Sequence, residues 1–379
     1  FQNCWKQKLN WTDEDFSKPN IFEIWNFRRK QSLIDAGIFH LEGVSLDHLG
    51  DFKPSKTGGM PTNERQWLQV EMRRKNKEKM WFDAEGMASE MSKWTFPLHF
   101  IDFETSRVAI PFNKGKRPYE GIAFQFSHHT VDEKGFVKHA GEFINAQPGV
   151  FPNYKFIRAL KAELEKDKGT IFRYADHENS FLVEIWRQIN SESDEAVPDK
   201  QALMDFIQTI SHSSEDSATR WIGQRDMVDM LKLVKNYFYH VSMKGSNSIK
   251  VVLPAVLEAS VFVKDKYSQP VYGIPGGMES LNFNEQVWYR TDDQGKAINP
   301  YKLLEPVFED MPDEDTEDFS VDDTIASGGA AMTAYARMQF TQMTDFEREH
   351  ARKALLRYCE LDTLAMVMIY EYWKDLISK

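Results

Sequence analysis

The stretch FPLHFIDFETSR, residues 96–107, has the composition of a strand covered on both faces, yet it carries two carboxylates. Side chains of a strand alternate between its faces, so Asp102 and Glu104 point to the same side. A strand this apolar belongs in the middle of a sheet. Isolated carboxylates buried there cost free energy or take up protons. The pattern therefore predicts that positive charge meets Asp102 and Glu104.

The composition of the whole chain limits the classes of protein to consider. Its 379 residues are enough for about two domains. The formal net charge of -11 argues against general attraction to nucleic acid, so any contact with phosphate must be local. Apolar runs stay below the roughly 18 residues of a membrane span, and two distant cysteines form no disulfide framework. We therefore expect a cytoplasmic protein without a membrane segment.

Hydrophobic periodicity predicts the order of the elements. Residues 1–95 have a helical pattern, and we expect them to be the tail of a longer protein. Strand-like segments follow at 96–105, 121–131 and 135–144, then a helix, a strand over 170–175 and another helix. Further helical patterns cover 201–210, 225–238 and 345–376, with insertions expected near 190–220 and 265–330.

This order predicts an α/β fold for residues 96–379: a mixed sheet of three antiparallel strands followed by parallel strands, flanked by helices. It resembles a ribonuclease H-like core, with residues 1–95 as a helical lead-in.

Further acids occur at positions where a packed fold would not be expected to need them. Asp362 lies at the centre of an apolar helical stripe, with Tyr358 one turn earlier on the same face. Asp176 and Glu178 follow the strand over 170–175, where sites of α/β folds gather. Each acid alone has a structural explanation, as a helix cap or as the partner of a buried group. Together with Asp102, they favour a functional site.

Several segments resemble known families. The motif DFET, an acid after the fourth strand, and YCELD are similar to the three motifs of DEDD exonucleases of the tyrosine subtype. Five segments together resemble an uncharacterised bacterial family, domain of unknown function 2779, over roughly residues 96–370: IDFET, RPYEGIAFQFSHH, KGSNSIKVVLP, GGAAMTAYARM and LLRYCELDTLAM. The DEDD pattern has Asp in its second motif, where this chain has Glu178, with Asp176 as the alternative.

The resemblance implies a metal-dependent 3'-5' exonuclease that hydrolyses phosphodiester bonds of DNA or RNA. Two Mg²⁺ or Mn²⁺ ions would be held by Asp102, Glu104, Glu178 and Asp362, and Tyr358 would orient the attacking water. Two alternatives remain open. One is a structure-selective endonuclease, and the other is an inactive nuclease-like module that binds nucleic acid or a protein.

Two short segments are candidates for contact with the substrate. Arg117 and Tyr119, just before the second strand, are suited to bind a phosphate and to stack on a base. Ser246, Ser248 and Lys250 lie at an expected helix start. The N-terminus of a helix attracts anions, but a serine that only caps the helix explains these residues equally well.

Cys4 lies close to the first residue given, Phe1. Longer members of the family that the chain resembles are similar, upstream, to iron-sulfur-containing PD-(D/E)XK nucleases, so we expect such a domain, with further cysteines, in the parent chain. A four-cysteine cluster needs more thiolates than Cys4 and Cys359 supply, so these residues by themselves are expected to bind none.

Overall fold

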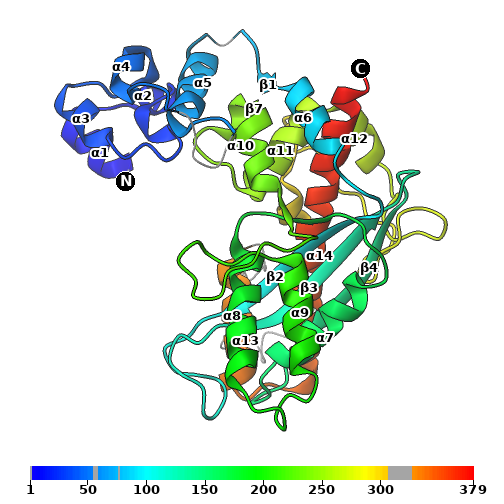
Figure 1. Ribbon diagram of the computed structural model, residues 1–379. Helices are drawn as coiled ribbons and strands as arrows, with labels where there is room; N and C mark the ends of the chain where they lie inside the picture. Colours follow the sequence, from blue (N-terminus) through cyan, green and yellow to red (C-terminus); the bar gives the residue numbers. More distant parts are fainter. Residues whose placement is uncertain (1, 54–58, 76, 306–326) are drawn as a thin grey trace. The chain divides into compact units, whose positions relative to one another are not determined.

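The structure is a computed structural model that describes residues 2–53, 59–75, 77–305 and 327–379 (Figure 1). The chain divides into two compact units. Unit 1 comprises Phe1–Ser89 and Leu231–Ala259, and unit 2 comprises Glu90–Met230 and Ser260–Lys379. Residues 306–326 of the expected insertion lie outside the described residues.

Unit 1 is mainly helical. Its helices and strands are α1 (Gln2–Leu9), α2 (Asp13–Ser17), α3 (Lys30–Asp35), α4 (Leu46–Leu49), α5 (Thr62–Lys75), β1 (Met80–Phe82), β7 (Phe238–His240) and α11 (Ile249–Ala259), with short 3-10 turns at Ile21–Glu23, Leu41–Gly43 and Val241–Met243. Helices α6 (Ala84–Met91) and α10 (Met230–Tyr237) cross the division between the units. Strand β1 pairs antiparallel with β7, which ties the two segments of unit 1 together.

Unit 2 is built on a five-stranded mixed sheet in the order β4-β3-β2-β5-β6. The strands are β2 (Leu98–Ser106), β3 (Ile122–Val131), β4 (Val137–Ile144), β5 (Ile171–Arg173) and β6 (Val228–Asp229). β2, β3 and β4 form an antiparallel meander, whereas β5 runs parallel to β2 and β6 runs parallel to β5. The expected mixed α/β sheet is therefore confirmed, with the acidic strand β2 at its centre.

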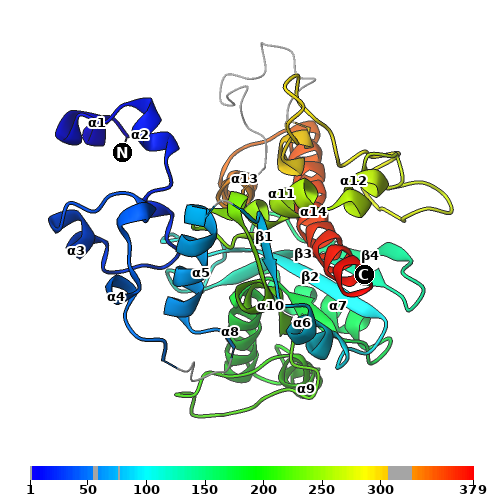
Figure 2. The same ribbon diagram turned by 90° about the horizontal axis from the view of Figure 1, so that it is seen from above.

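Helices cover both faces of this sheet (Figures 1 and 2). One face, which includes Ile101 and Phe103, packs against α7 (Asn153–Leu164), α8 (His177–Ser191) and α9 (Lys200–Ile210) in a continuous apolar core. The other face carries Asp102 and meets α14 (Asp345–Ile377), against which α12 (Val261–Tyr267) and α13 (Gly328–Phe340) pack. A 3-10 turn at Pro300–Leu303 also reaches α14, through Tyr301. Alternation along β2 thus separates an apolar face from a polar one.

Two features of the elements differ from the expectations. The helix predicted over 225–238 begins only at Met230, because Val228 and Asp229 instead pair with β5 as β6, a strand too short to show a period. The helical pattern of residues 1–95 also does not predict strand β1, whose partner β7 lies far along the chain. No helix among the described residues combines the length and the apolar character that a membrane crossing requires.

The turn that leads into β5 allows a specific test of how that strand is held beside β2. A Cβ atom on Gly169 would overlap the backbone oxygen of Pro97, and no side-chain rotation relieves this overlap. Gly169→Ala is therefore expected to lower the free energy of unfolding by about 3 kcal/mol, in the upper range of overpacking costs. Urea denaturation measures the change.

Gly328 at the start of α13 is the matched control, because a Cβ atom there meets nothing within 4 Å. Gly328→Ala is expected to change stability by less than about 1 kcal/mol. Equal effects of the two substitutions would contradict the close packing of Gly169.

Candidate functional site

Four of the predicted acids come together in unit 2: Asp102, Glu104 and Asp362 on the α14 face of the sheet, and Glu178 from the start of α8. Asp102 and Glu104 lie on the same face of β2, and the thiol of Cys359 on α14 is 3.6 Å from Asp102 Oδ2. Asp102, Glu104 and Cys359 each offer one ligand atom, and these three atoms lie within 4.8 Å of one another. Glu104 is buried and Asp102 half-buried, so the carboxylates are largely withdrawn from water. We call Asp102, Glu104, Glu178 and Asp362 the acid cluster.

Asp362 enters the acid cluster from α14. It is buried, as is Tyr358 one turn before it. The hydroxyl of Tyr301 donates a hydrogen bond to Asp362 Oδ1, and the rings of Tyr301 and Tyr358 lie 6.3 Å apart between centroids. Two tyrosines therefore flank Asp362, of which only Tyr358 was predicted from the sequence.

The structure separates the two candidate acids that follow β5. Glu178, in the first turn of α8, is 1% exposed, and its charge acts on Asp102. Asp176 precedes α8 with a side chain that is 63% exposed, where it accepts a hydrogen bond from Ser180 Oγ at 3.0 Å. Glu178 is thus the acid that the fold brings to Asp102.

A buried arginine and a further acid adjoin Glu178. Arg173, the last residue of β5, is fully buried with its Nη1 3.7 Å from Asp229 Oδ2. Asp229 ends β6 and accepts a hydrogen bond at 3.0 Å from the backbone amide of Ala175, which has a φ of 76°. Sequence reasoning missed Asp229 because its strand has two residues, although an acid at the end of a strand is itself a signal.

Burial and mutual repulsion set the charges in the acid cluster. The pKa of Asp102 is raised well above its ordinary value, first by burial and then by the charges of Asp362, Glu178 and Glu104. Burial also raises the pKa of Glu178 to about 8, although hydrogen bonds from backbone groups and the charge of Arg173 act against it. The pKa of Tyr358 is raised by burial and by the adjacent carboxylates, so its hydroxyl keeps its proton. Without a cation, the cluster therefore favours protonated carboxyls.

The candidate substrate residues fall into two groups. Arg117 and Tyr119 are exposed on the connection between β2 and β3, in the same unit as the acid cluster, and Tyr119 is 63% exposed with a φ of 60°. Ser246, Ser248 and Lys250 belong to unit 1, at the start of α11. The structure therefore brings only Arg117 and Tyr119 into the unit of the acids.

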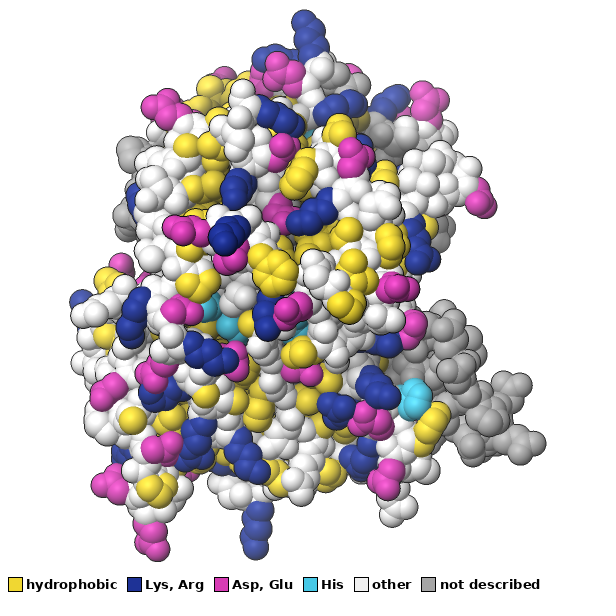
Figure 3. Space-filling view, turned by 90° about the vertical axis from the view of Figure 1, so that its right-hand side faces the viewer, with side chains coloured by type: hydrophobic (Ala, Val, Ile, Leu, Met, Phe, Trp, Pro, Cys, Tyr) yellow, Lys and Arg dark blue, Asp and Glu magenta, His cyan; other side chains and the backbone are white. Residues whose placement is uncertain are grey.

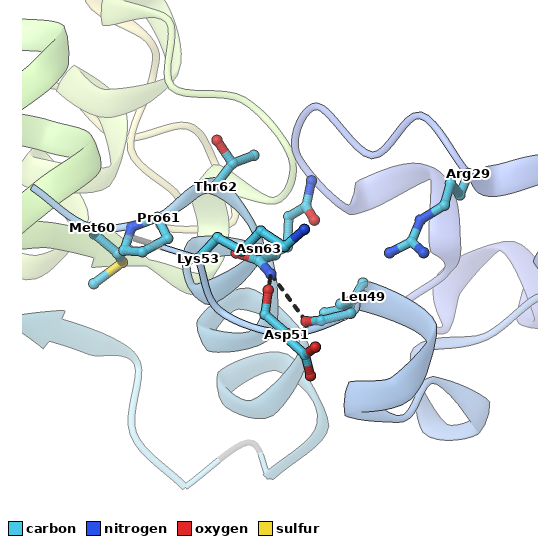
Figure 4. Close-up of a pocket in the computed structure, with 10 residues that line it drawn as sticks. Arg29, Leu49, Asp51, Lys53, Met60, Pro61, Thr62 and Asn63 are labelled. Atoms are coloured by element: carbon cyan, nitrogen blue, oxygen red, sulfur yellow. Dashed lines mark hydrogen bonds between the residues drawn. The ribbon is translucent and has the colours of Figure 1, made fainter. Parts of the chain in front are cut away.

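Unit 1 has a pocket of its own, with a volume of about 590 Å³ (Figure 4). It opens beside the start of α5, where Asn63 Nδ2 donates to the carbonyl of Gly50 at 3.0 Å. Its basic residues, Arg29 and Lys53, are exposed. The pocket has polar walls but lacks a buried charged group among its described residues.

The pKa of Glu178 makes stability depend on pH in a predictable direction. Between pH 4.5 and about pH 8 the folded protein keeps a proton on Glu178 that the unfolded chain releases. Stability is therefore expected to fall as pH rises through this range in the presence of EDTA, by up to about 1.4 kcal/mol per pH unit. Urea denaturation at several pH values measures the slope, which Glu178→Gln is expected to flatten.

Asp194 serves as the control, because its side chain is 94% exposed. Asp194→Asn is expected to keep the wild-type slope. A slope that Glu178→Gln leaves unchanged would show that Glu178 does not hold the proton.

A family model matches part of the chain, residues 99–248. Neither the curated proteins nor the solved structures contain a match to this chain. The matched segment covers β2 from its second residue onward, β3 to β6 and three of the four clustered acids, whereas Asp362 lies beyond it. Residues 99–248 match the model of the family described as Domain of unknown function (DUF2779).

Proposed function

We propose that this chain is a metal-dependent nuclease that hydrolyses phosphodiester bonds of DNA or RNA, acting as a 3'-5' exonuclease of the DEDD type. The observation that carries the proposal is the convergence of Asp102, Glu104, Glu178 and Asp362 in one largely buried cluster. So many carboxylates withdrawn from water are costly unless cations neutralise them.

The topology supports a ribonuclease H-like arrangement of the acids. An antiparallel meander is followed by two strands parallel to β2, which lies at the centre of the sheet. The acids come from the central strand β2, from the helix that follows β5, and from the long helix α14. This is the chain order of the three DEDD motifs.

The residues of the acid cluster fit a pair of Mg²⁺ or Mn²⁺ ions. Their oxygen ligands suit hard divalent cations, and Glu178 Oε2 is buried without a hydrogen bond among the described residues. When bound, such ions would supply a water of lowered pKa and would stabilise the charge that develops on the departing oxygen. Asp102, Glu104, Glu178 and Asp362 would hold them, and these acids would then all be ionised.

The two tyrosines would have different tasks. Tyr358 keeps its phenolic proton and lies beside the carboxylates, so it can orient the water that attacks the phosphorus. The Tyr301 hydroxyl donates to Asp362 and would fix the direction of that carboxylate. Tyr358 thus acts on the reacting water, whereas Tyr301 positions an acid.

The protein would contact nucleic acid through a few residues rather than through a broad basic surface. On the face drawn in Figure 3, lysines and arginines are interspersed with acids rather than gathered into one patch. Within unit 2, Arg117 and Tyr119 are exposed and can bind a phosphate and stack on a base. Ser246, Ser248 and Lys250 of unit 1 remain candidates for an anion, with the cap as their alternative role.

The proposal predicts which acids the reaction needs. Asp102→Ala and Glu178→Gln are expected to lower Mn²⁺-dependent cleavage on the order of 10³-fold. Asp176→Asn, the control on the exposed acid beside Glu178, is expected to retain activity within about threefold of wild type, a size typical of exposed positions. The assay uses 5'-labelled single-stranded DNA and RNA, with and without a blocked 3' end, together with closed and nicked circles.

The outcomes separate the alternatives. Stepwise shortening that a blocked 3' end prevents supports the exonuclease, whereas cleavage of closed circles indicates an endonuclease. Mn²⁺ binding without cleavage of any substrate would identify an inactive binding module. Full activity of Asp102→Ala would refute the role of the acid cluster.

The tyrosines predict different kinetic effects. Tyr358→Phe is expected to lower kcat about 100-fold with an unchanged KM, because it misplaces the attacking water. Tyr301→Phe is expected chiefly to raise the Mn²⁺ concentration needed for half-maximal rate, since Asp362 loses its hydrogen bond. Steady-state kinetics over a Mn²⁺ series measure both, and a wild-type kcat in Tyr358→Phe would exclude the assigned role.

A further inference from the structure

A second group of titratable side chains lies on the same side of the sheet as Asp102 and Asp362. His139 and Glu142 on β4 and Glu360 on α14 each offer one ligand atom, and these atoms lie within 4.8 Å of one another. His139 and Glu360 are buried, with exposed fractions of 1% and 0%. We call these three residues the histidine–glutamate group. The proposed nuclease reaction does not use it.

A β-bulge brings the two β4 residues to one face. His139 and Glu142 are three positions apart, so a regular strand would point them to opposite faces. The register shifts between His128 and His129 of β3: His129 pairs with His139, whereas Ser127 pairs with Glu142. Ser127 and His129 share a face, and the extra residue Ala140 therefore lets His139 and Glu142 share it too.

The imidazole of His139 is oriented as a metal ligand would be. Its Nε2 is 3.0 Å from Ser127 Oγ, which holds the ring in place. Its buried Nδ1 lies 3.2 Å from Glu360 Oε2, close enough for an ion pair if the ring is protonated, and makes no well-aligned hydrogen bond among the described residues. Two ligand atoms on one Zn²⁺ ion are separated by roughly 3.0–3.4 Å, given bonds of about 2.0–2.1 Å. The contact thus has the spacing of two ligands that share an ion.

The two carboxylates of the group share one amide side chain. Asn282 Nδ2 donates to Glu142 Oε2 at 2.6 Å and to Glu360 Oε2 at 2.8 Å. Within the described ranges, neither glutamate forms an ion pair with lysine or arginine. Rotation of the Asn282 amide by half a turn would put its oxygen between the carboxylates and offer a further ligand.

We propose that His139, Glu142 and Glu360 form a second metal site, which binds one divalent transition-metal ion such as Zn²⁺. One imidazole nitrogen with two carboxylates suits Zn²⁺ better than Mg²⁺, whereas the all-oxygen acid cluster has the opposite preference. Asp362 and Glu360 are close along α14 but face different strands, because Glu360 meets His139 on β4.

The ion would anchor an irregular segment of the chain, residues 268–299. Between α12 and the 3-10 turn at Pro300–Leu303, residues 268–299 contain only isolated bridges. Three residues of this segment reach Glu360: Tyr272 and Ser280 donate to its Oε1, and Asn282 donates to its Oε2. A connection of this length needs anchors to hold one conformation. The site would thus join the segment to β4 and α14.

The test measures zinc binding to the full chain in an Asp102→Asn background, which removes one ligand of the acid cluster. Protein freed of metal by EDTA is dialysed against buffered Zn²⁺, and bound zinc is determined by atomic emission. We expect one equivalent to remain and Zn²⁺ to raise Tm. Adding Glu142→Gln is expected to weaken this binding at least about 10-fold and to remove the rise in Tm.

Glu163→Gln is the matched control, because Glu163 is another glutamate beside a histidine, 3.4 Å from His128 Nδ1, outside the group. It is expected to leave zinc binding unchanged. His139→Asn is the second variant, which keeps the site testable if Glu142→Gln does not fold. No bound zinc in Asp102→Asn, or equal zinc binding with and without Glu142→Gln, would overturn the proposal. Neither result depends on nuclease activity.

Discussion

The packing of α14 against a polar sheet face is the interaction on which the second unit depends. Gln125 of β3 donates to the carbonyl of Leu355 at 2.7 Å, and Thr363 Oγ1 lies 2.8 Å from Ser127 Oγ and 2.7 Å from His129 Nδ1. These groups are buried, so a shift of the helix would leave donors and acceptors without partners. Polar contacts therefore set the register of α14, and that register brings Asp362 to Asp102.

The same polar face explains how far sequence reasoning could go. Alternation along β2 placed Asp102 with Glu104, and helical spacing placed Tyr358 and Asp362 on one side of α14, because both periods are regular. His139 and Glu142 could not be paired in this way, since the bulge at Ala140 breaks the period of the strand. Tyr301 was missed because the 3-10 turn that carries it has four residues and no recognisable pattern.

The arrangement around Arg173 shows how the fold limits the repulsion among so many acids. This fully buried guanidinium lies between Asp229 and the exposed Asp176, and its charge acts against the raised pKa of Glu178. At Asp102, by contrast, burial and the charges of Asp362, Glu178 and Glu104 raise the pKa well above its ordinary value, although the hydrogen bond from the Cys359 thiol acts against them. One side of the acid cluster is thus neutralised by the protein, and under the proposed function a cation would neutralise the other side.

The return of residues 231–259 into unit 1 bears on how the chain can be divided. β7 lies in this segment and pairs with β1, and Asn247 accepts a hydrogen bond from the buried Arg65 of α5 at 3.1 Å. A fragment that starts near residue 96 would retain 231–259 without either partner, with an open strand edge and newly exposed apolar side chains. Separate expression of the sheet unit therefore requires removal of an internal segment and a linker from Met230 to Ser260, rather than a single cut.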